Sequence, residues 1–129
     1  MVNITELTDY IYSLVRQANL TTFKYRSPNN QKGTFVVVNP LALVGRKDQS
    51  AVVNVNVYTD NLVLNINGVN DQSQPNAAEL QRAIELVLPF IEDNNWGNNI
   101  LVNIDRSTPI YEETQTFINL RINYRKINY

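Results

Sequence analysis

The strongest candidates for catalytic chemistry in this sequence are two adjacent carboxylates, Glu112 and Glu113. Asp105 lies shortly before them. Two acidic side chains placed around one substrate atom can act as general acid and general base. Adjacent residues of an extended chain point to opposite sides, so these two cannot converge on one atom. Carboxylates in connecting segments are ordinarily solvated. The pattern therefore favours an exposed acidic segment over a catalytic pair.

The 129-residue chain contains neither cysteine nor histidine, so it has no thiolate and lacks the commonest general base. Phosphate-binding loops of the GxxxxGK[ST] and GxGxxG types do not occur in it. Asp9, beside Tyr10 and Tyr12, lies off the apolar stripe of its segment and is expected to face solvent. Composition still allows a calcium or magnesium site built from carboxylates. No spacing indicates one, and we predict no enzymatic activity, catalytic residue, cofactor or metal.

A basic and aromatic cluster closes the sequence, and it consists of Arg121, Tyr124, Arg125, Lys126 and Tyr129. Cationic and aromatic side chains together can hold single-stranded nucleic acid through phosphate contacts and base stacking. The net charge of −1 supplies no overall attraction to phosphate. An ordinary polar strand face is therefore favoured. Binding of nucleic acid by this cluster is the alternative function.

Hydrophobic periodicity places these residues on two helices and six strands. Apolar residues at spacings of three and four predict amphipathic helices over 3–18 and 76–93, capped by Asn3 and Asn76. Pro89 is expected to kink or end the second helix, and 94–98 to stop it. Alternating apolar and polar residues predict the strands, which we place at 22–26, 34–38, 51–59, 62–67, 99–106 and 114–129.

The connections are predicted from turn residues and proline. The first two strands are expected to pair as a hairpin around 27–33, and Pro40 to end the second. Segments 41–48 and 107–113 are predicted to be connections, and Asn67-Gly68 a tight turn.

These elements predict a single α+β domain over residues 1–129. Its sheet is expected to be mainly antiparallel, with about six strands and one face covered by the two amphipathic helices. No apolar run approaches the ~20 residues that span a bilayer, and the first residues do not resemble a signal peptide. We therefore predict no association with a membrane.

Neutral asparagine, of which the chain has 20, occupies the polar positions of several strands. Codon bias of an AT-rich genome is the simpler explanation for the number. The amides can nevertheless pack against a partner, since they both donate and accept hydrogen bonds. Monomers usually charge exposed sheet faces and edges more heavily, and apolar connections usually need a partner. The predicted contact residues are Leu41, Leu43, Val44, Ile110, Tyr111, Asn119, Arg121, Asn123 and Arg125.

The order of a helix, a hairpin, the strand AVVNVNVYTDNL, a capped helix and the segment ILVNIDRSTPIYEETQTFINLRINYRKINY resembles a known family. It is similar to the tail-terminator (tail-completion) and neck proteins of tailed bacteriophages. In that family a strand of the type V-x-V-Y-T/A-P/D precedes a linker and one long helix, and a long final strand closes the sheet. The corresponding segments here are 53–60, 76–93 and 117–124.

The resemblance implies a structural virion subunit, assembled in the bacterial host cytoplasm. Such subunits form a homo-oligomeric ring, usually a hexamer, at the tail end or the head–tail junction. Other tail or neck proteins would be partners, DNA would pass through the lumen, and there would be no catalytic residue. Family members often separate charge between the faces of the ring more clearly than this sequence does.

Overall fold

The computed structural model describes residues 3–92 and 100–127, and these residues form an α+β fold, as predicted. Two helices accompany a mixed, mostly antiparallel sheet of five strands and a separate two-stranded hairpin. In chain order the elements are α1 (Ile4–Arg16), β1 (Thr21–Lys24), β2 (Phe35–Val44), β3 (Asp48–Asp60), β4 (Leu64–Ile66), β5 (Val69–Asp71), α2 (Ala77–Glu92), β6 (Ile100–Tyr111) and β7 (Gln115–Ile127). The predicted helix stop at 94–98 and Tyr129 lie outside the described residues.

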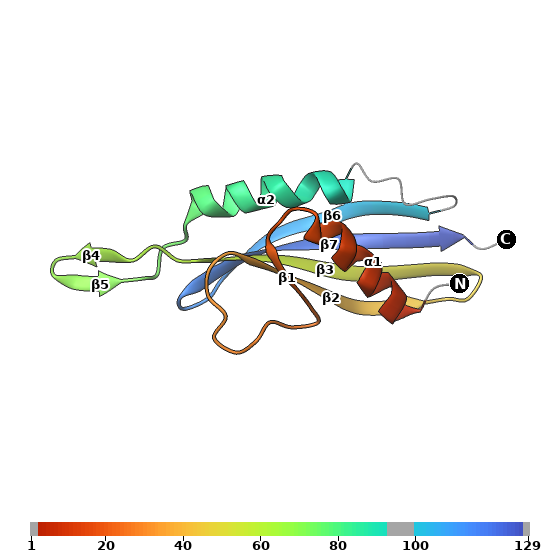
Figure 1. Cartoon of the computed structure of the whole chain (residues 1–129), viewed down its shortest axis with the longest axis horizontal. Coiled ribbons are helices and arrows are strands. Elements are labelled where there is room, and N and C mark those ends of the chain that lie inside the picture. Colours follow the sequence, from red (N-terminus) through yellow and green to blue (C-terminus); the bar gives the residue numbers. More distant parts are fainter. Residues whose placement is uncertain (1–2, 93–99, 128–129) are drawn as a thin grey trace.

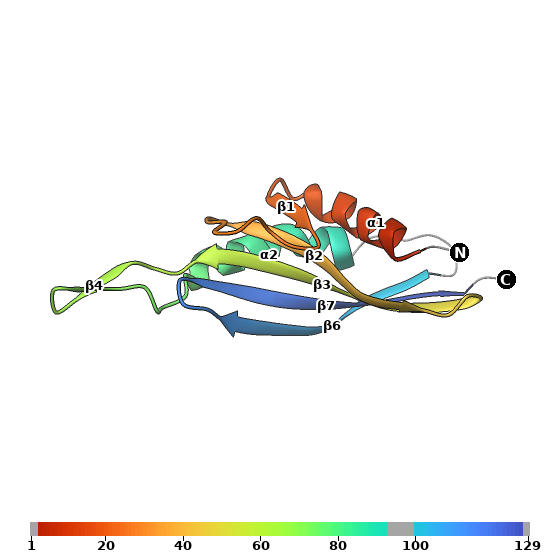
Figure 2. The same ribbon diagram turned by 90° about the horizontal axis from the view of Figure 1, so that it is seen from below.

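The main sheet has the strand order β1-β2-β3-β7-β6, and its strands run along the long axis of the molecule (Figure 1). β1 pairs with β2 in parallel, whereas every other pair in this sheet is antiparallel. Both helices lie on one side of the sheet (Figure 2). The β4–β5 hairpin projects beyond one end of the sheet (Figure 1).

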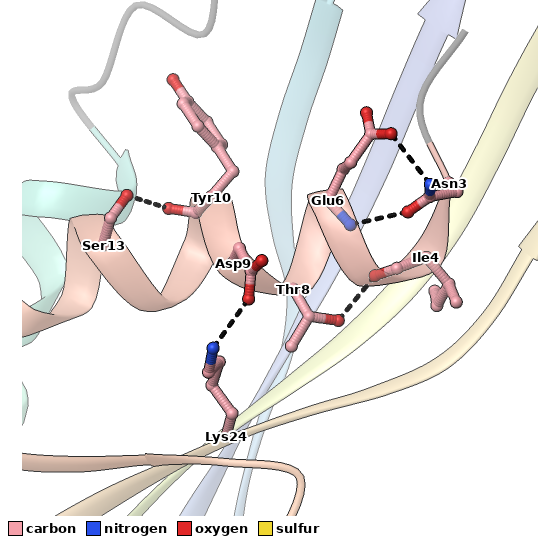
Figure 3. Close-up of polar contacts among 8 residues, drawn as sticks. All are labelled: Asn3, Ile4, Glu6, Thr8, Asp9, Tyr10, Ser13 and Lys24. Carbon is pink, nitrogen blue, oxygen red and sulfur yellow. Dashed lines mark hydrogen bonds and ion pairs between the residues drawn. The ribbon is translucent and has the colours of Figure 1, made fainter.

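Helix α1 begins where the sequence predicts, because Asn3 caps it (Figure 3). The Asn3 Oδ1 atom accepts a hydrogen bond from the Glu6 N–H, and Asn3 Nδ2 donates to Glu6 Oε1, each over 2.8 Å. Thr8, which is fully buried, donates its hydroxyl hydrogen to the Ile4 carbonyl over 2.7 Å. Asp9 is exposed, as predicted, and forms an ion pair of 2.9 Å with Lys24 on β1.

The core lies between the helices and the covered face of the sheet. The alternation predicted for β3 and β7 is confirmed: Val53 and Val55 lie opposite Ile122 and Leu120, and Val57 shares their face. All five side chains are at most 1% exposed. Each aliphatic side chain buried in this way contributes about 1.5–3 kcal/mol. Helix α2 runs through Pro89 to Glu92, so that Ile91, 1% exposed, still reaches this core.

The predicted hairpin between the first two strands is wrong, because β1 and β2 are parallel neighbours. Parallel pairing needs a connection that returns along the strand, and residues 25–34 form it. The turn residues of 27–33 favour reversal of the chain, but they do not specify how far it returns. Phe23 packs edge to face against Phe35, with the ring centroids 6.0 Å apart, and this contact stabilises the parallel pair in the folded sheet.

Two predicted connections, 41–48 and 107–113, are in fact largely strand, and only 45–47 and 112–113 remain outside the strands. β2 continues through Pro40 to Val44, and the register shifts between Pro40 and Ala42, which leaves Leu41 as an extra residue. β6 continues through residues 107–111, with a similar shift between Ile104 and Arg106. Proline is tolerated at bulges and on edge strands, and β6 is an edge strand that carries Pro109.

The predicted strand at 62–67 does not join the main sheet. Its residues 64–66 form β4, which turns at Asn67-Gly68 and pairs with β5, a strand that was not predicted. Asn67 and Gly68 have φ values of 53° and 77°, the left-handed region that two-residue hairpin turns require. The predicted tight turn is therefore confirmed. The strand before the turn, β4, projects into solvent with β5 instead of joining the main sheet.

Candidate assembly surfaces

The face of the sheet opposite the helices, which we call the open face, carries a row of aromatic rings across four strands. Phe35 stacks on Tyr58 and Tyr58 on Phe117, each with ring centroids 4.5 Å apart, and Phe23 meets the other side of Phe35. Phe35 is only 1% exposed although it points away from the helices. A hollow beside the stack is lined by Tyr25, Arg26, Ser27, Asn29, Val37, Asn39, Asn56 and Tyr58. The 25–34 connection therefore lies against this part of the open face.

The predicted polar contact residues Asn119, Arg121, Asn123 and Arg125 share the open face, since they alternate with the buried residues of β7. The Asn119 Nδ2 atom donates to Asn56 Oδ1 on β3 over 2.6 Å. Arg121 lies 3.7 Å from Asp105, the extra residue of the β6 bulge.

Arg106 was missed as a member of this face. It pairs in register with Arg121, because the bulge at Asp105 shifts β6 by one residue. Strand alternation without the bulge would have placed Arg106 on the covered face. The bulge that places Arg106 on the open face is defined by the pairing of β6 with β7, so the sequence of β6 alone does not indicate it.

The predicted apolar contact residues fall into different environments. Leu41 and Val44 are 56% and 60% exposed. Leu43 is partly buried and packs against the core, so it supports the fold. Ile110 continues the aromatic row beside Phe117, whereas Tyr111, the next residue, points to the other side of β6. The structure therefore does not bring these five side chains together.

The β4–β5 hairpin, which we call the arm, is the contact element that sequence reasoning missed. In its register Leu64 pairs with Asp71 and Ile66 with Val69, so these four side chains share one face. Leu64, Ile66 and Val69 are 36%, 50% and 66% exposed. A two-stranded hairpin alone is marginally stable in water, so an exposed apolar face on one favours a partner. The Asn-Gly turn between apolar residues was the signal that predicts such a hairpin.

The base of the arm is fixed by Asn61, a buried amide that is 4% exposed. Asn61 Nδ2 donates to the Gln72 carbonyl over 2.9 Å and contacts the Glu112 carbonyl at 3.4 Å. Asn61 Oδ1 accepts from the Thr116 hydroxyl over 2.7 Å. One side chain thus joins the arm, the β6–β7 turn and the start of β7.

Charged side chains separate between the two ends of the sheet. The end that carries the arm, the arm end, has Asp60, Asp71, Glu112, Glu113 and Lys32 on its strands and turns, and the paired Glu79 and Arg82 at the start of α2. The opposite end, the basic end, has Arg46, Lys47, Asp48, Arg125 and Lys126 on the β2–β3 turn and on β7. The first turn of α1 and the last of α2 lie toward the basic end on the helix side and carry Glu6 and Glu92 (Figure 1). The strands therefore carry opposite net charge at their two ends, although charges of both signs are spread along the sequence.

A shallow hollow opens on the basic end of the open face, and we call it the basic-end hollow. Its lining is Ala42, Val44, Ser50, Ala51, Val52, Asn123, Tyr124 and Arg125. Three of the predicted contact residues, Val44, Asn123 and Arg125, are thus brought together there. The surface combines aliphatic side chains with one guanidinium group.

Glu79 in the first turn of α2 joins the helix to the 25–34 connection. Its carboxylate accepts hydrogen bonds from Arg82 Nε over 2.9 Å and from the Thr34 hydroxyl over 2.8 Å. These bonds hold the pKa of the Glu79 carboxyl at about 2, below its ordinary value of 4.5. The Asn76 Oδ1 atom caps the same turn by accepting from the Glu79 N–H.

The low pKa of Glu79 predicts a specific loss of stability in acid. Its contribution is present above pH 4.5 and is lost as the pH falls through about 2, where the folded state takes up the proton. We expect Glu79→Gln to be less stable than wild type at pH 7, and the difference to shrink between pH 4.5 and 2. Urea unfolding midpoints of both proteins across this range measure it. A constant difference down to pH 2 would contradict the assignment.

Within residues 3–92 and 100–127, no three acidic side chains are grouped so as to hold a metal ion. Neither helix in this part of the chain is long and apolar enough to cross a membrane. The sequence matches no protein-family model, and no curated protein is significantly similar to it.

Proposed function

We propose that this protein is a structural subunit that assembles into a ring, of the kind found at the tail end or head–tail junction of tailed bacteriophages. The observation that carries the proposal is the arm, whose apolar face is exposed beyond the end of the sheet. An element of this kind serves a contact with another chain better than it serves a pocket for a small molecule. The part of the resemblance that does not depend on the predicted hairpin, a strand at 53–60 followed by a linker, a capped helix and a long final strand, supports the same class.

The separation of charge between the two ends supports contacts of the head-to-tail type. A surface on one end that fits a different surface on the other end repeats from subunit to subunit. Such contacts either close into a ring or grow into a filament. In the virion the ring, which we propose to be a hexamer, would meet other tail or neck proteins on its two faces and pass DNA through its lumen.

Solution mass tests the proposal. We expect light scattering over a tenfold range of concentration to show a closed species of about six subunits, or its appearance as concentration rises. Electron micrographs of that species should show rings. A monomer at every concentration would contradict the proposal that this chain forms a ring.

A second candidate is a module that binds nucleic acid, and the position of Arg106 favours it, although Tyr124 of the predicted cluster is 3% exposed in the core and is not available to stack on a base. Arg106, Arg121 and Arg125 all lie on the open face, so three guanidinium groups face the same side. Phosphate binding by this face would weaken steeply with salt. Fluorescence anisotropy with a labelled oligonucleotide, for wild type and for Arg121→Ala/Arg125→Ala, separates this candidate from assembly.

A further inference from the structure

We infer that the arm of one subunit seats its apolar face in the basic-end hollow of the next copy of this chain, with Asp71 facing Arg125. The inference rests on the proposed function, because it specifies the contact through which the subunits would assemble. The partner is a second copy of the chain, and the arm end of one subunit meets the basic end of the next. Each of these follows from the distribution of apolar and charged side chains.

The arm presents a surface with a defined chemical order. Val69 and Ile66 lie near the turn, Leu64 lies next, and Asp71 lies opposite Leu64 at the base. Asp71 accepts a hydrogen bond from the Ser73 hydroxyl over 2.9 Å, which holds its carboxylate beside the apolar row. It is the one charged residue between positions 61 and 78. A surface that fits the arm must therefore be aliphatic, with one cation at its edge.

The basic-end hollow has this composition. Ala42, Val44 and Val52 supply aliphatic surface, and Arg125 supplies the cation. Val44 is 60% exposed, so a contact there would remove apolar area from water. No carboxylate lines the hollow. A guanidinium group at the edge of the contact would fix its register through Asp71 more than it would add affinity.

A second apolar groove fits the arm less well. It lies between α2 and β6 and is lined by Ala77, Leu80, Gln81, Ile84, Glu85, Ser107 and Ile118. Glu85 is its only charged lining residue, and it has the same sign as Asp71. Like charges brought together in a contact disfavour it. The charges therefore favour the basic-end hollow as the receiving surface.

The two surfaces lie at opposite ends of the sheet. β3 runs from Asp48 at the basic end to Asp60 at the arm end, and the arm continues beyond it (Figure 1). One subunit can therefore give its arm to one neighbour and receive an arm from another. This heterologous contact is the type that closes into a ring or grows into a filament.

Two single variants and their mixture test the contact. Ile66→Asp places a charge in the arm face, and Val44→Asp places one in the hollow; both positions are at least half exposed, so folding should be retained. We expect each variant to raise the dissociation constant of the contact by at least about a hundredfold and to be monomeric. Leu86→Asp, an exposed apolar position of α2 outside both surfaces, is the matched control and should assemble like wild type.

Mixing the two variants gives the sharpest result. The intact arm of Val44→Asp can enter the intact hollow of Ile66→Asp, and no further contact can form. The expected product is a one-to-one dimer, measured by light scattering and by native mass spectrometry with one isotope-labelled variant. A mixture that stays monomeric, or that regains large rings, would overturn head-to-tail seating of the arm.

Charge reversal tests the register independently. Asp71→Arg and Arg125→Asp should each weaken assembly about tenfold, and the double variant should recover it. Absence of recovery in the double variant would overturn the pairing of Asp71 with Arg125. Wild-type rings that persist in both Ile66→Asp and Val44→Asp would overturn this contact and leave the proposed function standing. A wild type that never assembles would overturn both.

Discussion

Replacing Phe35 with alanine is expected to lower the free energy of unfolding by about 3–5 kcal/mol. Phe35 is 1% exposed and lies between the rings of Phe23 and Tyr58. Alanine would remove both ring contacts and leave a cavity under the 25–34 connection. Since small domains are stable by only about 5–15 kcal/mol, this one change would remove a large part of the total. Urea unfolding followed by circular dichroism measures it.

Tyr111→Ala is the matched control for this prediction, because Tyr111 is aromatic and 66% exposed. Its cost should stay within about 0.5 kcal/mol. A loss below about 1.5 kcal/mol in Phe35→Ala would mean that the aromatic stack contributes little to the stability of the fold. Amide exchange in residues 25–34 gives a local reading, and it should accelerate in Phe35→Ala and not in the control.

Replacing Asn61 with alanine is expected to cost about 2–4 kcal/mol and to loosen the arm. The amide bonds the Gln72 carbonyl and the Thr116 hydroxyl and contacts the Glu112 carbonyl, all at partly or fully buried positions. Truncation would leave these groups without their partner in a site too buried to be resolvated freely. Amide exchange of β4 and β5 should therefore accelerate more than that of β3. Denaturant unfolding gives the global part of the effect.

Asn65→Ala provides the comparison on the same element. Asn65 Oδ1 accepts a hydrogen bond from the Gly68 N–H over 3.0 Å, but the contact is exposed. Its loss should cost below about 1 kcal/mol and leave the base of the arm in place. Equal amide exchange rates of β4 and β5 in Asn61→Ala and Asn65→Ala would contradict the role of Asn61 as the anchor of the arm. If the arm is the assembly contact, Asn61→Ala should also weaken assembly more than Asn65→Ala.

Phe35 and Asn61 both stabilise parts of the fold that lie outside the main core between helices and sheet. Phe35 stabilises the open face, where the 25–34 connection and the aromatic stack meet. Asn61 orients the arm relative to the sheet. Asn61 would therefore support the arm that enters the proposed contact, whereas Phe35, which pairs with Tyr58 toward the arm end, lies away from the basic-end hollow.

The sequence by itself was sufficient for the elements whose signals are local. Helix α1 follows from its apolar spacing and its Asn3 cap, and the central strands follow from alternation in residues 51–59 and 114–129. The shared face of Asn119, Arg121, Asn123 and Arg125 followed from the same alternation. These signals are local because each depends on the period of one element, 3.6 or 2 residues.

The tertiary structure decided the features that depend on pairing between distant segments. Parallel pairing of β1 and β2, the passage of β2 through Pro40 and the placement of Arg106 on the open face each depend on a neighbouring strand. Asn67-Gly68 specified the tight turn, but only the fold showed that the hairpin leaves the sheet. The separation of charge appeared only when the antiparallel strands brought the β2–β3 turn and the end of β7 to one end of the sheet, and Asp60 and the β6–β7 turn to the other. Periodicity shows which side of an element is apolar, whereas pairing, edges and end charges are set by contacts between residues far apart in the chain.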